Sequence, residues 1–230
     1  MAGHLNPGGQ QFRADRGAAD PRVTAALAAH QAGQGSEQAA LTALAAARLL
    51  VPVVAVLVDG TAAQGDKDSE MVLPTLIGRD GRTAVLAFTS LDALARWRPE
   101  ARPVPAEADR VWRAAVADGC AVVIDVAGPV PLAVEGARLA ALAAGQPVPP
   151  PHEDPDVHAE VQAAVAAEPA IAGFSLAPGR PGVTDLAVRL QQARPGPAGE
   201  WGPAVNRAAA GIAARLGIRL RRGIEVVIAE

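Results

Sequence analysis

The most concentrated polar chemistry of the sequence lies in one loop, residues 66 to 70. The loop holds Lys67, the single lysine of the chain, close to Asp68 and Glu70. A lysine among carboxylates could act as an acid, a base or a contact for an anion. The alternative, which we favour, is a solvated loop whose charges keep a sheet edge from pairing with other chains. We therefore expect Lys67, Asp68 and Glu70 to act as surface contacts and not as catalysts.

A second group of binding candidates lies in the segment ARWRPEARPVP, which contains Trp97, Arg98 and Arg102. Arginine forks and an indole ring suit a carboxylate, a phosphate or a partner peptide. In the competing interpretation, which we favour, the Trp97 side chain is packed in the core or between domains, and the arginines cover the exposed edge of its ring. We keep Trp97, Arg98 and Arg102 as candidate binding residues together with the loop.

Other reaction chemistry finds little support in the sequence. The chain has no phosphate-binding glycine loop, no G-x-S-x-G turn and no H-E-x-x-H helix. Residues 152 to 158 combine histidines with carboxylates, but a proline-rich segment does not preorganise metal ligands. Cys120 opens an apolar run, which predicts a buried thiol of low reactivity. We assign no catalytic residue, cofactor or metal ligand.

Composition narrows the class of partner. The 230 residues carry a net charge of −3 with an isoelectric point near 5.8, which argues against a general nucleic-acid binder. No apolar run approaches the roughly 18 residues that a membrane helix needs, and the first residues do not resemble a signal peptide. A single cysteine excludes an intrachain disulfide framework. We expect a cytoplasmic protein that binds neither nucleic acid nor membranes; its oligomeric state stays open.

Helices and strands alternate along the chain, and their order predicts an α+β fold with a mixed or mostly antiparallel sheet packed by helices. Asp20 and Ser36 open two helices, the second with Arg48 in its last turn, and Ser90 opens a short helix that Pro99 closes. Asp80 and Gly81 suit the turn of a β-hairpin. The other predicted elements are helices near 107–117, 136–144, 155–167 and 199–217, and strands near 53–58, 120–126, 130–134, 171–177, 183–190 and 223–230.

The proline-rich stretch GQPVPPPHEDPD predicts a domain boundary, because it is stiff and has no apolar period. We expect a second, smaller α+β domain after it. The predicted division is an irregular arm at 1–18, a larger domain at 19–145, a linker at 146–156 and the smaller domain at 157–230.

The segments VPVVAV, KDSEM, AVLAFTS, RWRPEARPVP and VVIDVAGP, in this order, resemble the N-terminal domain of the SseB family, named for an enhanced-serine-sensitivity phenotype. The resemblance covers about residues 15 to 145. The tail, through PAIAGFSLA, TDLAVRL and GIEVVI, is similar to the C-terminal domain of some members. The resemblance implies no catalytic residue and no cofactor, and it does not extend to the unrelated secretion translocon subunit of the same name.

These observations favour a non-enzymatic binding or interaction protein whose ligand is another protein or a small polar or anionic molecule. The alternative is an enzyme or accessory factor of amino-acid or sulfur metabolism, which the phenotype behind the family name suggests. A third possibility is a subunit of a larger assembly, which a long apolar patch on the smaller domain would favour.

Overall fold

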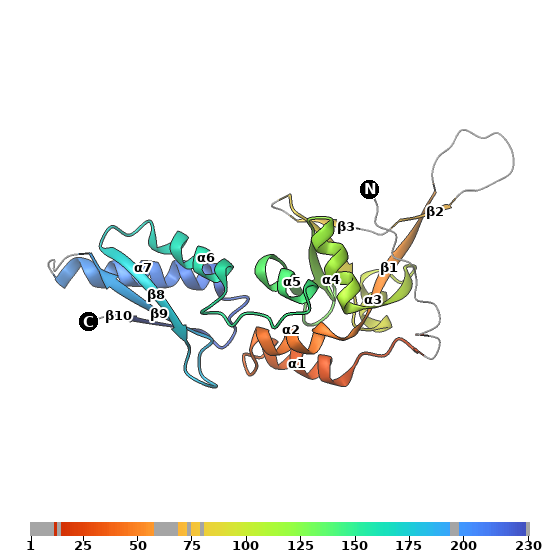
Figure 1. Ribbon diagram of the computed structural model, residues 1–230, viewed down its shortest axis with the longest axis horizontal. Helices are drawn as coiled ribbons and strands as arrows, with labels where there is room; N and C mark the ends of the chain where they lie inside the picture. Colours follow the sequence, from red (N-terminus) through yellow and green to blue (C-terminus); the bar gives the residue numbers. More distant parts are fainter. Residues whose placement is uncertain are drawn as a thin grey trace. The chain divides into compact units, whose positions relative to one another are not determined.

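The computed structural model shows an α+β protein whose described residues form two compact units (Figure 1). The first unit comprises Met1–Thr24 and Leu44–Gln146, and the second comprises Ala25–Ala43 and Pro147–Glu230. The predicted fold class is confirmed, because the described part of the chain contains seven helices and three mixed or antiparallel sheets. The domain boundaries predicted from the sequence stay a prediction. The structure describes residues 12, 15–57, 69–72, 75–78, 81–193 and 198–228, with the backbone alone at 54–57, 69–72 and 198–200.

The first unit holds two sheets. In the three-stranded sheet, β1 (Arg48–Leu57) pairs antiparallel with both β2 (Ser69–Val72) and β5 (Arg102–Glu107). The four-stranded sheet has the order β3-β4-β6-β7, with only β4 and β6 parallel among its described strands. Its strands are β3 (Thr75–Ile77), β4 (Thr83–Ala87), β6 (Ala121–Ile124) and β7 (Leu132–Val134). A parallel pair places two carboxyl-terminal strand ends at one edge, where the candidate site described below is built.

Helices α3 (Leu91–Trp97), α4 (Ala108–Ala117) and α5 (Gly136–Ala143) complete the first unit. Helix α4 is strongly amphipathic: Val111, Trp112 and Ala115 are buried on one face, and Arg113 lies exposed on the other. Trp112 is the largest fully buried side chain of the described residues. The core is thus built from one large indole and many small aliphatic side chains.

Local signals place most helix ends where the sequence predicts them. Ser90 caps α3, since its side chain accepts a hydrogen bond from the Ala93 amide at 3.1 Å. Ser36 does the same for α2 (Glu37–Ala45), accepting from the amide of Ala39. Helix α1 spans Pro21–Gln31, with a proline at its first position as expected. The predicted hairpin between β3 and β4 is confirmed by their antiparallel pairing; Asp80 lies outside the described residues.

Several details differ from the sequence-based predictions, among them Glu70, which was expected in a loop and lies in strand β2. The second helix ends at Ala45, and Arg48 is the first residue of β1. Strand β5 was not predicted because it contains Pro103 and Pro105; it lies at a sheet edge, where a missing N–H is tolerated. Cys120 is only partly buried and precedes β6, so the expectation of a buried thiol within a strand is wrong.

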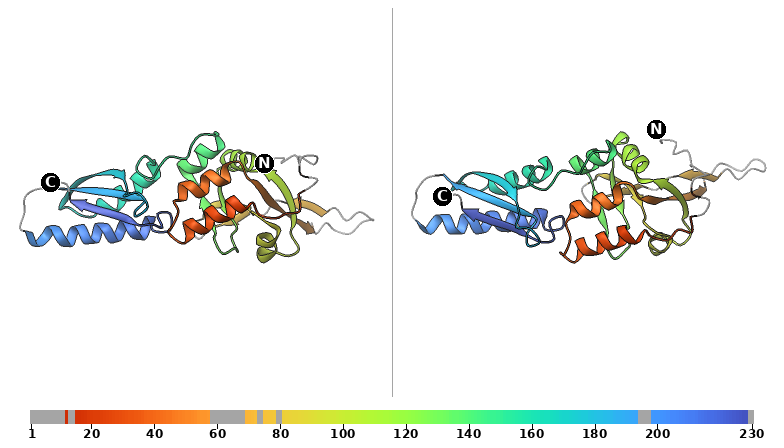
Figure 2. Two further views of the ribbon diagram at one scale, coloured as in Figure 1. Left: turned by 90° about the horizontal axis from the view of Figure 1, so that it is seen from below. Right: turned by 60° about the horizontal axis from the view of Figure 1, so that its bottom comes forward.

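The second unit contains one three-stranded sheet of order β10-β9-β8 (Figure 2). Strand β8 (Ile171–Pro178) is antiparallel to β9 (Leu186–Gln192), and β10 (Ile224–Ile228) is parallel to β9. Helices α6 (Pro155–Val165) and α7 (Ala198–Leu216) contribute to the same core. Its fully buried side chains include Val157, Val161, Leu186, Val188, Leu190 and Ile212.

A buried ion cluster connects three segments of this second unit. The guanidinium of Arg219 lies 2.6 Å from a carboxylate oxygen of Asp154 and 3.2 Å from one of Glu37. Asp154 also caps α6 by accepting from the Asp156 amide. Burial disfavours the charged guanidinium, but the two carboxylates outweigh burial and raise the pKa of Arg219. One arginine therefore ties the starts of α2 and α6 to the turn that follows α7.

Replacing Arg219 with alanine should lower the free energy of unfolding of the second unit by about 3 to 5 kcal/mol, because it leaves two buried carboxylates uncompensated. The matched control is Arg215→Ala, since Arg215 forms a pair with Glu160 in which both side chains are nearly half exposed. That change should cost at most about 1 kcal/mol. Urea unfolding of both variants measures the difference; equal losses would contradict the role assigned to the cluster.

His30 makes this unit sensitive to acid. It is buried, and burial lowers the pKa of its imidazole, although Glu37 and Asp185 raise it and Arg221 lowers it. The unfolded chain thus takes up a proton at higher pH than the folded chain, so stability falls as pH drops below about 6.5.

We expect His30→Gln to reduce the loss of unfolding free energy between about pH 7.5 and about pH 5.5. His158→Gln, which makes the same replacement at an exposed histidine of the same unit, is the control. Urea midpoints measured at both pH values provide the test. If both variants have the pH slope of the parent protein, His30 does not carry the effect.

Candidate functional site

The candidate site lies in the first unit, where the chain passes from β4 into α3. Strand β4 ends at Ala87 and is followed by Phe88, Thr89 and Ser90, which caps the helix. Because β6 runs parallel to β4, the residue that follows β6, Asp125, lies at the same edge of the sheet. The Asp125 amide donates to the carbonyl of Ala87 at 3.0 Å, which fixes the two strand ends together.

Asp125 is a buried carboxylate with two strong hydrogen bonds. It accepts from the Thr89 amide at 2.8 Å and from the Thr89 hydroxyl at 2.7 Å, and the residue is 7% exposed. Burial raises the pKa of its carboxyl group, and the two hydrogen bonds from Thr89 oppose this rise. Its φ of 49° is unusual for a residue other than glycine. Strain of this kind persists only where surrounding contacts compensate for it.

Arg48, the first residue of β1, stabilises the sheet edge at which Thr89 and Asp125 lie. Its guanidinium donates to the carbonyl of Thr89 at 3.1 Å and forms an ion pair of 2.6 Å with Asp15. It also donates to the carbonyl of Ala18, and the Leu91 amide donates to the carbonyl of Gly17 at 2.8 Å. The segment before α1 is therefore bound to the start of α3.

Trp97 and Arg98, of which only the arginine is exposed, lie next to each other at the other end of α3. The Trp97 ring is half-buried, with its centroid 5.6 Å from that of Phe88. The Arg98 guanidinium lies 5.0 Å above the indole, in a cation–π arrangement, and 3.5 Å from the Glu100 carboxylate. The inner part of the indole packs on the core cluster that contains Phe88, while the arginine stays accessible to solvent.

The structure places the remaining candidates less completely. Arg102 is exposed and begins β5, paired with Val53 of β1. Glu70 lies in β2 opposite Val56, and only its backbone is described. Lys67 and Asp68 lie outside the described residues. A binding role for all six candidates stays a prediction, and of these residues the structure brings Trp97 and Arg98 into contact.

Sequence reasoning missed Arg48, Thr89 and Asp125 as members of one arrangement. Asp125 was read as part of a longer strand and Arg48 as the end of a helix. The available signal was the polar pair at the ends of two apolar runs, LAFTS and VVIDV. It becomes informative only if the two strands are known to be parallel neighbours, because only then do their ends meet.

The described part of the chain contains neither a cluster of potential metal ligands nor a helix suited to crossing a membrane. No group of three or more His, Cys, Asp or Glu residues there could hold a metal ion. Of the residues suspected at 152–158, Asp154 is paired with Arg219, and the His158 ring lies 4.8 Å from Phe174. None of the described helices has the length and apolar character needed to cross a membrane.

These features define a mixed α+β protein. A family model described as the SseB protein N-terminal domain matches residues 23–141. The chain therefore belongs to the SseB family, as its motifs suggest. The match includes α2, every described strand from β1 to β7 and most of α1 and α5, and it ends before the proline-rich stretch at 145–156. Searches of curated proteins and of solved structures found no match.

The Asp125 arrangement makes a specific prediction about its variants. Asn has the same shape, tolerates a positive φ and keeps one oxygen for the Thr89 amide, so Asp125→Asn should change the free energy of unfolding by at most about 1 kcal/mol. Asp125→Ala leaves the Thr89 groups unpaired and should cost about 1 to 3 kcal/mol.

The pH dependence follows from the raised pKa of Asp125. The folded protein takes up this proton at higher pH than the unfolded chain, so the parent protein should gain stability relative to Asp125→Asn as pH falls toward about 4. Unfolding curves of both proteins at several pH values test the sign. A relative loss on acidification would contradict the assignment.

Proposed function

We propose that this protein is a non-enzymatic binding protein that recognises a partner protein through the Trp97 surface, defined as Trp97, Arg98 and Arg102. The observation that carries the proposal is the Arg98 guanidinium held 5.0 Å above the half-buried Trp97 ring. Tryptophan and arginine are enriched among the residues that dominate binding energies at protein interfaces. A pair of this kind supports recognition better than it supports catalysis.

The contacts that fix helix α3 support the proposal, because they limit the conformational entropy that the Trp97 surface loses on binding. Helix α3 is capped by Ser90 at its start, and Thr89 before it is fixed by Asp125 and Arg48. The Trp97 ring rests on Phe88. Side chains that already hold their bound geometry lose less freedom when a partner arrives.

The expected partner presents carboxylates. Three arginines, Arg96, Arg98 and Arg102, are exposed between residues 92 and 102. The same segment holds only two acidic residues, Asp92 and Glu100, so positive charge is in excess there. Guanidinium groups bind carboxylates in a bidentate manner. Lys67, Asp68 and Glu70 are proposed as further binding residues, in addition to the Trp97 surface.

We also propose that the protein is located in the cytoplasm, because a chain with one cysteine suits a reducing compartment.

The test compares proteins captured from a lysate of the source cells by the parent chain and by the double variant Trp97→Ala, Arg98→Glu. The matched control is Arg110→Ala, Arg113→Glu, which changes two exposed arginines of α4. The first variant should weaken the affinity for a captured partner at least about tenfold, or by roughly 1.4 kcal/mol, and the control should not. Capture that is unaffected by the first variant, or the absence of any specific partner, would contradict the proposal.

A second candidate function is that of an enzyme or accessory factor in amino-acid or sulfur metabolism. The observation that favours it is Asp125, a buried and strained carboxylate at the carboxyl ends of two parallel strands. A thermal-shift screen of amino acids and sulfur metabolites separates the two functions. A metabolite that stabilises the parent protein but not the folded Asp125→Asn variant would favour the enzyme or accessory role over the binding protein.

A further inference from the structure

We propose that the second unit binds an extended peptide segment, which adds as a further strand to the free edge of β8. The site is the groove between α6 and β8, called here the α6–β8 groove. It lies outside residues 23–141 and shares no residue with the Trp97 surface. The inference is therefore independent of the function proposed above.

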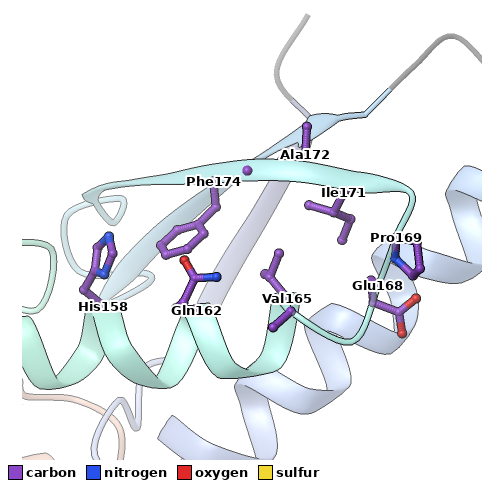
Figure 3. A pocket seen from close by; sticks show the side chains of 10 residues that line it. His158, Gln162, Val165, Glu168, Pro169, Ile171, Ala172 and Phe174 are labelled. Atoms are coloured by element: carbon purple, nitrogen blue, oxygen red, sulfur yellow. The ribbon is translucent and has the colours of Figure 1, made fainter.

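The α6–β8 groove is a hollow of about 310 Å³ (Figure 3). The helix contributes residues from one face, and the strand contributes its first half. Figure 3 shows the side chains of His158, Gln162 and Phe174 lying toward the same space, with Val165 and Ile171 further along it. Its volume is at the lower limit of ligand pockets, so it suits one apolar side chain and a short length of main chain.

The strand edge is the main binding feature of the groove. Among the described strands, β8 pairs with β9 alone, so its second edge has no partner strand. In an antiparallel ladder, every second residue of an edge strand directs its N–H and C=O groups away from its neighbour. Such a row of groups is complementary to the main chain of an extended peptide. The register of β8 against β9 shifts between Ile171 and Gly173, so the regular part of the strand begins at Gly173.

The helix side of the groove adds a free hydrogen-bonding group next to an apolar surface. Within the described part of the chain, the side-chain amide of Gln162 has no hydrogen-bond partner, and the residue is exposed. The His158 ring lies against Phe174 with centroids 4.8 Å apart and planes tilted by 43°. The amide can bind the peptide main chain, and the rings with Val165 can hold an apolar side chain.

The charges around the groove decide which class of ligand fits. The ionisable residues that line it are His158 and Glu168. Glu168 accepts hydrogen bonds of 2.9 and 2.7 Å from Arg207, which lowers the pKa of its carboxyl group and compensates its charge. A free anion or a metal ion therefore gains little here. A neutral main chain with an apolar side chain matches the hydrogen-bonding groups and the lining.

The experiment selects binders from a random library of twelve-residue peptides with the full chain as bait and measures affinity by fluorescence polarisation. Selected peptides should carry a β-branched or other apolar residue within an uncharged stretch. Gln162→Trp, which fills the groove from an exposed position, should weaken binding at least tenfold. The control Gln31→Trp alters an exposed glutamine on α1 and should leave affinity unchanged. No enriched peptide, or equal binding by both variants, would overturn the proposal.

Peptides methylated on single backbone nitrogens test the mode of binding. Strand addition uses every second N–H of the ligand, so methylation should abolish binding at alternate positions only. A response without this period of two would overturn strand addition. The groove could instead be filled by a second copy of the chain, which sedimentation of the full chain tests. A dimer that Gln162→Trp dissociates would assign the groove to that second copy and would overturn the peptide proposal.

Discussion

The parallel pairing of β4 with β6 is the constraint on which the first unit depends. It brings Thr89 and Asp125 to one sheet edge, and their two hydrogen bonds fix the point at which the chain turns into α3. The arrangement requires a buried carboxylate and a positive φ, both of which are unfavourable by themselves. The compensation comes from the hydrogen bonds that Thr89 donates to the Asp125 carboxylate and from the hydrogen bond that the Asp125 amide donates to the carbonyl of Ala87. Arg48 adds a hydrogen bond to the carbonyl of Thr89. The position of the Trp97 and Arg98 pair follows from this fixed start of the helix.

The second unit uses charge in a different way. Its buried arginine, Arg219, is satisfied by Glu37 and Asp154, which come from segments distant in the sequence. A buried ion pair adds little net stability compared with a well-packed apolar alternative, but losing one partner is costly. The cost of removing one partner is therefore no measure of the net contribution of the cluster to stability. Because Ala25–Ala43, with most of α1 and α2, belongs to the second unit, the matched residues 23–141 come from both units.

The Trp97 surface and the α6–β8 groove follow one physical pattern. In each of these two proposed binding surfaces, an exposed side chain rests on a partly buried ring that packs on the core: Arg98 on Trp97, and His158 on Phe174. The free binding groups are then already oriented, which reduces the entropy cost of association. The surfaces differ in what they offer, since one presents arginines and the other neutral hydrogen-bonding groups.

The sequence by itself determined the elements whose signals are local. Ser36, Ser90 and Asp154 cap helices through side-chain contacts with residues two or three positions away, so their positions predict helix starts. Runs of β-branched residues likewise predicted β6, β9 and β10, and the family suspected from the motifs is confirmed by the family model. Strand β5 was not predicted, because its prolines disfavour a strand everywhere except at a sheet edge. Which strand lies at an edge is decided by the tertiary structure.

Only the tertiary structure decided which polar residues meet. Thr89 and Asp125 are 36 residues apart, and Arg219 and Glu37 are 182 residues apart. Neither pair has a local signal, because each depends on the pairing of strands or the packing of helices from distant parts of the chain. The α6–β8 groove has the same origin, since an unpaired strand edge exists only once the order of the strands is set. The sequence thus determined the helices, most strands and the family, whereas strand order decided where binding chemistry could assemble.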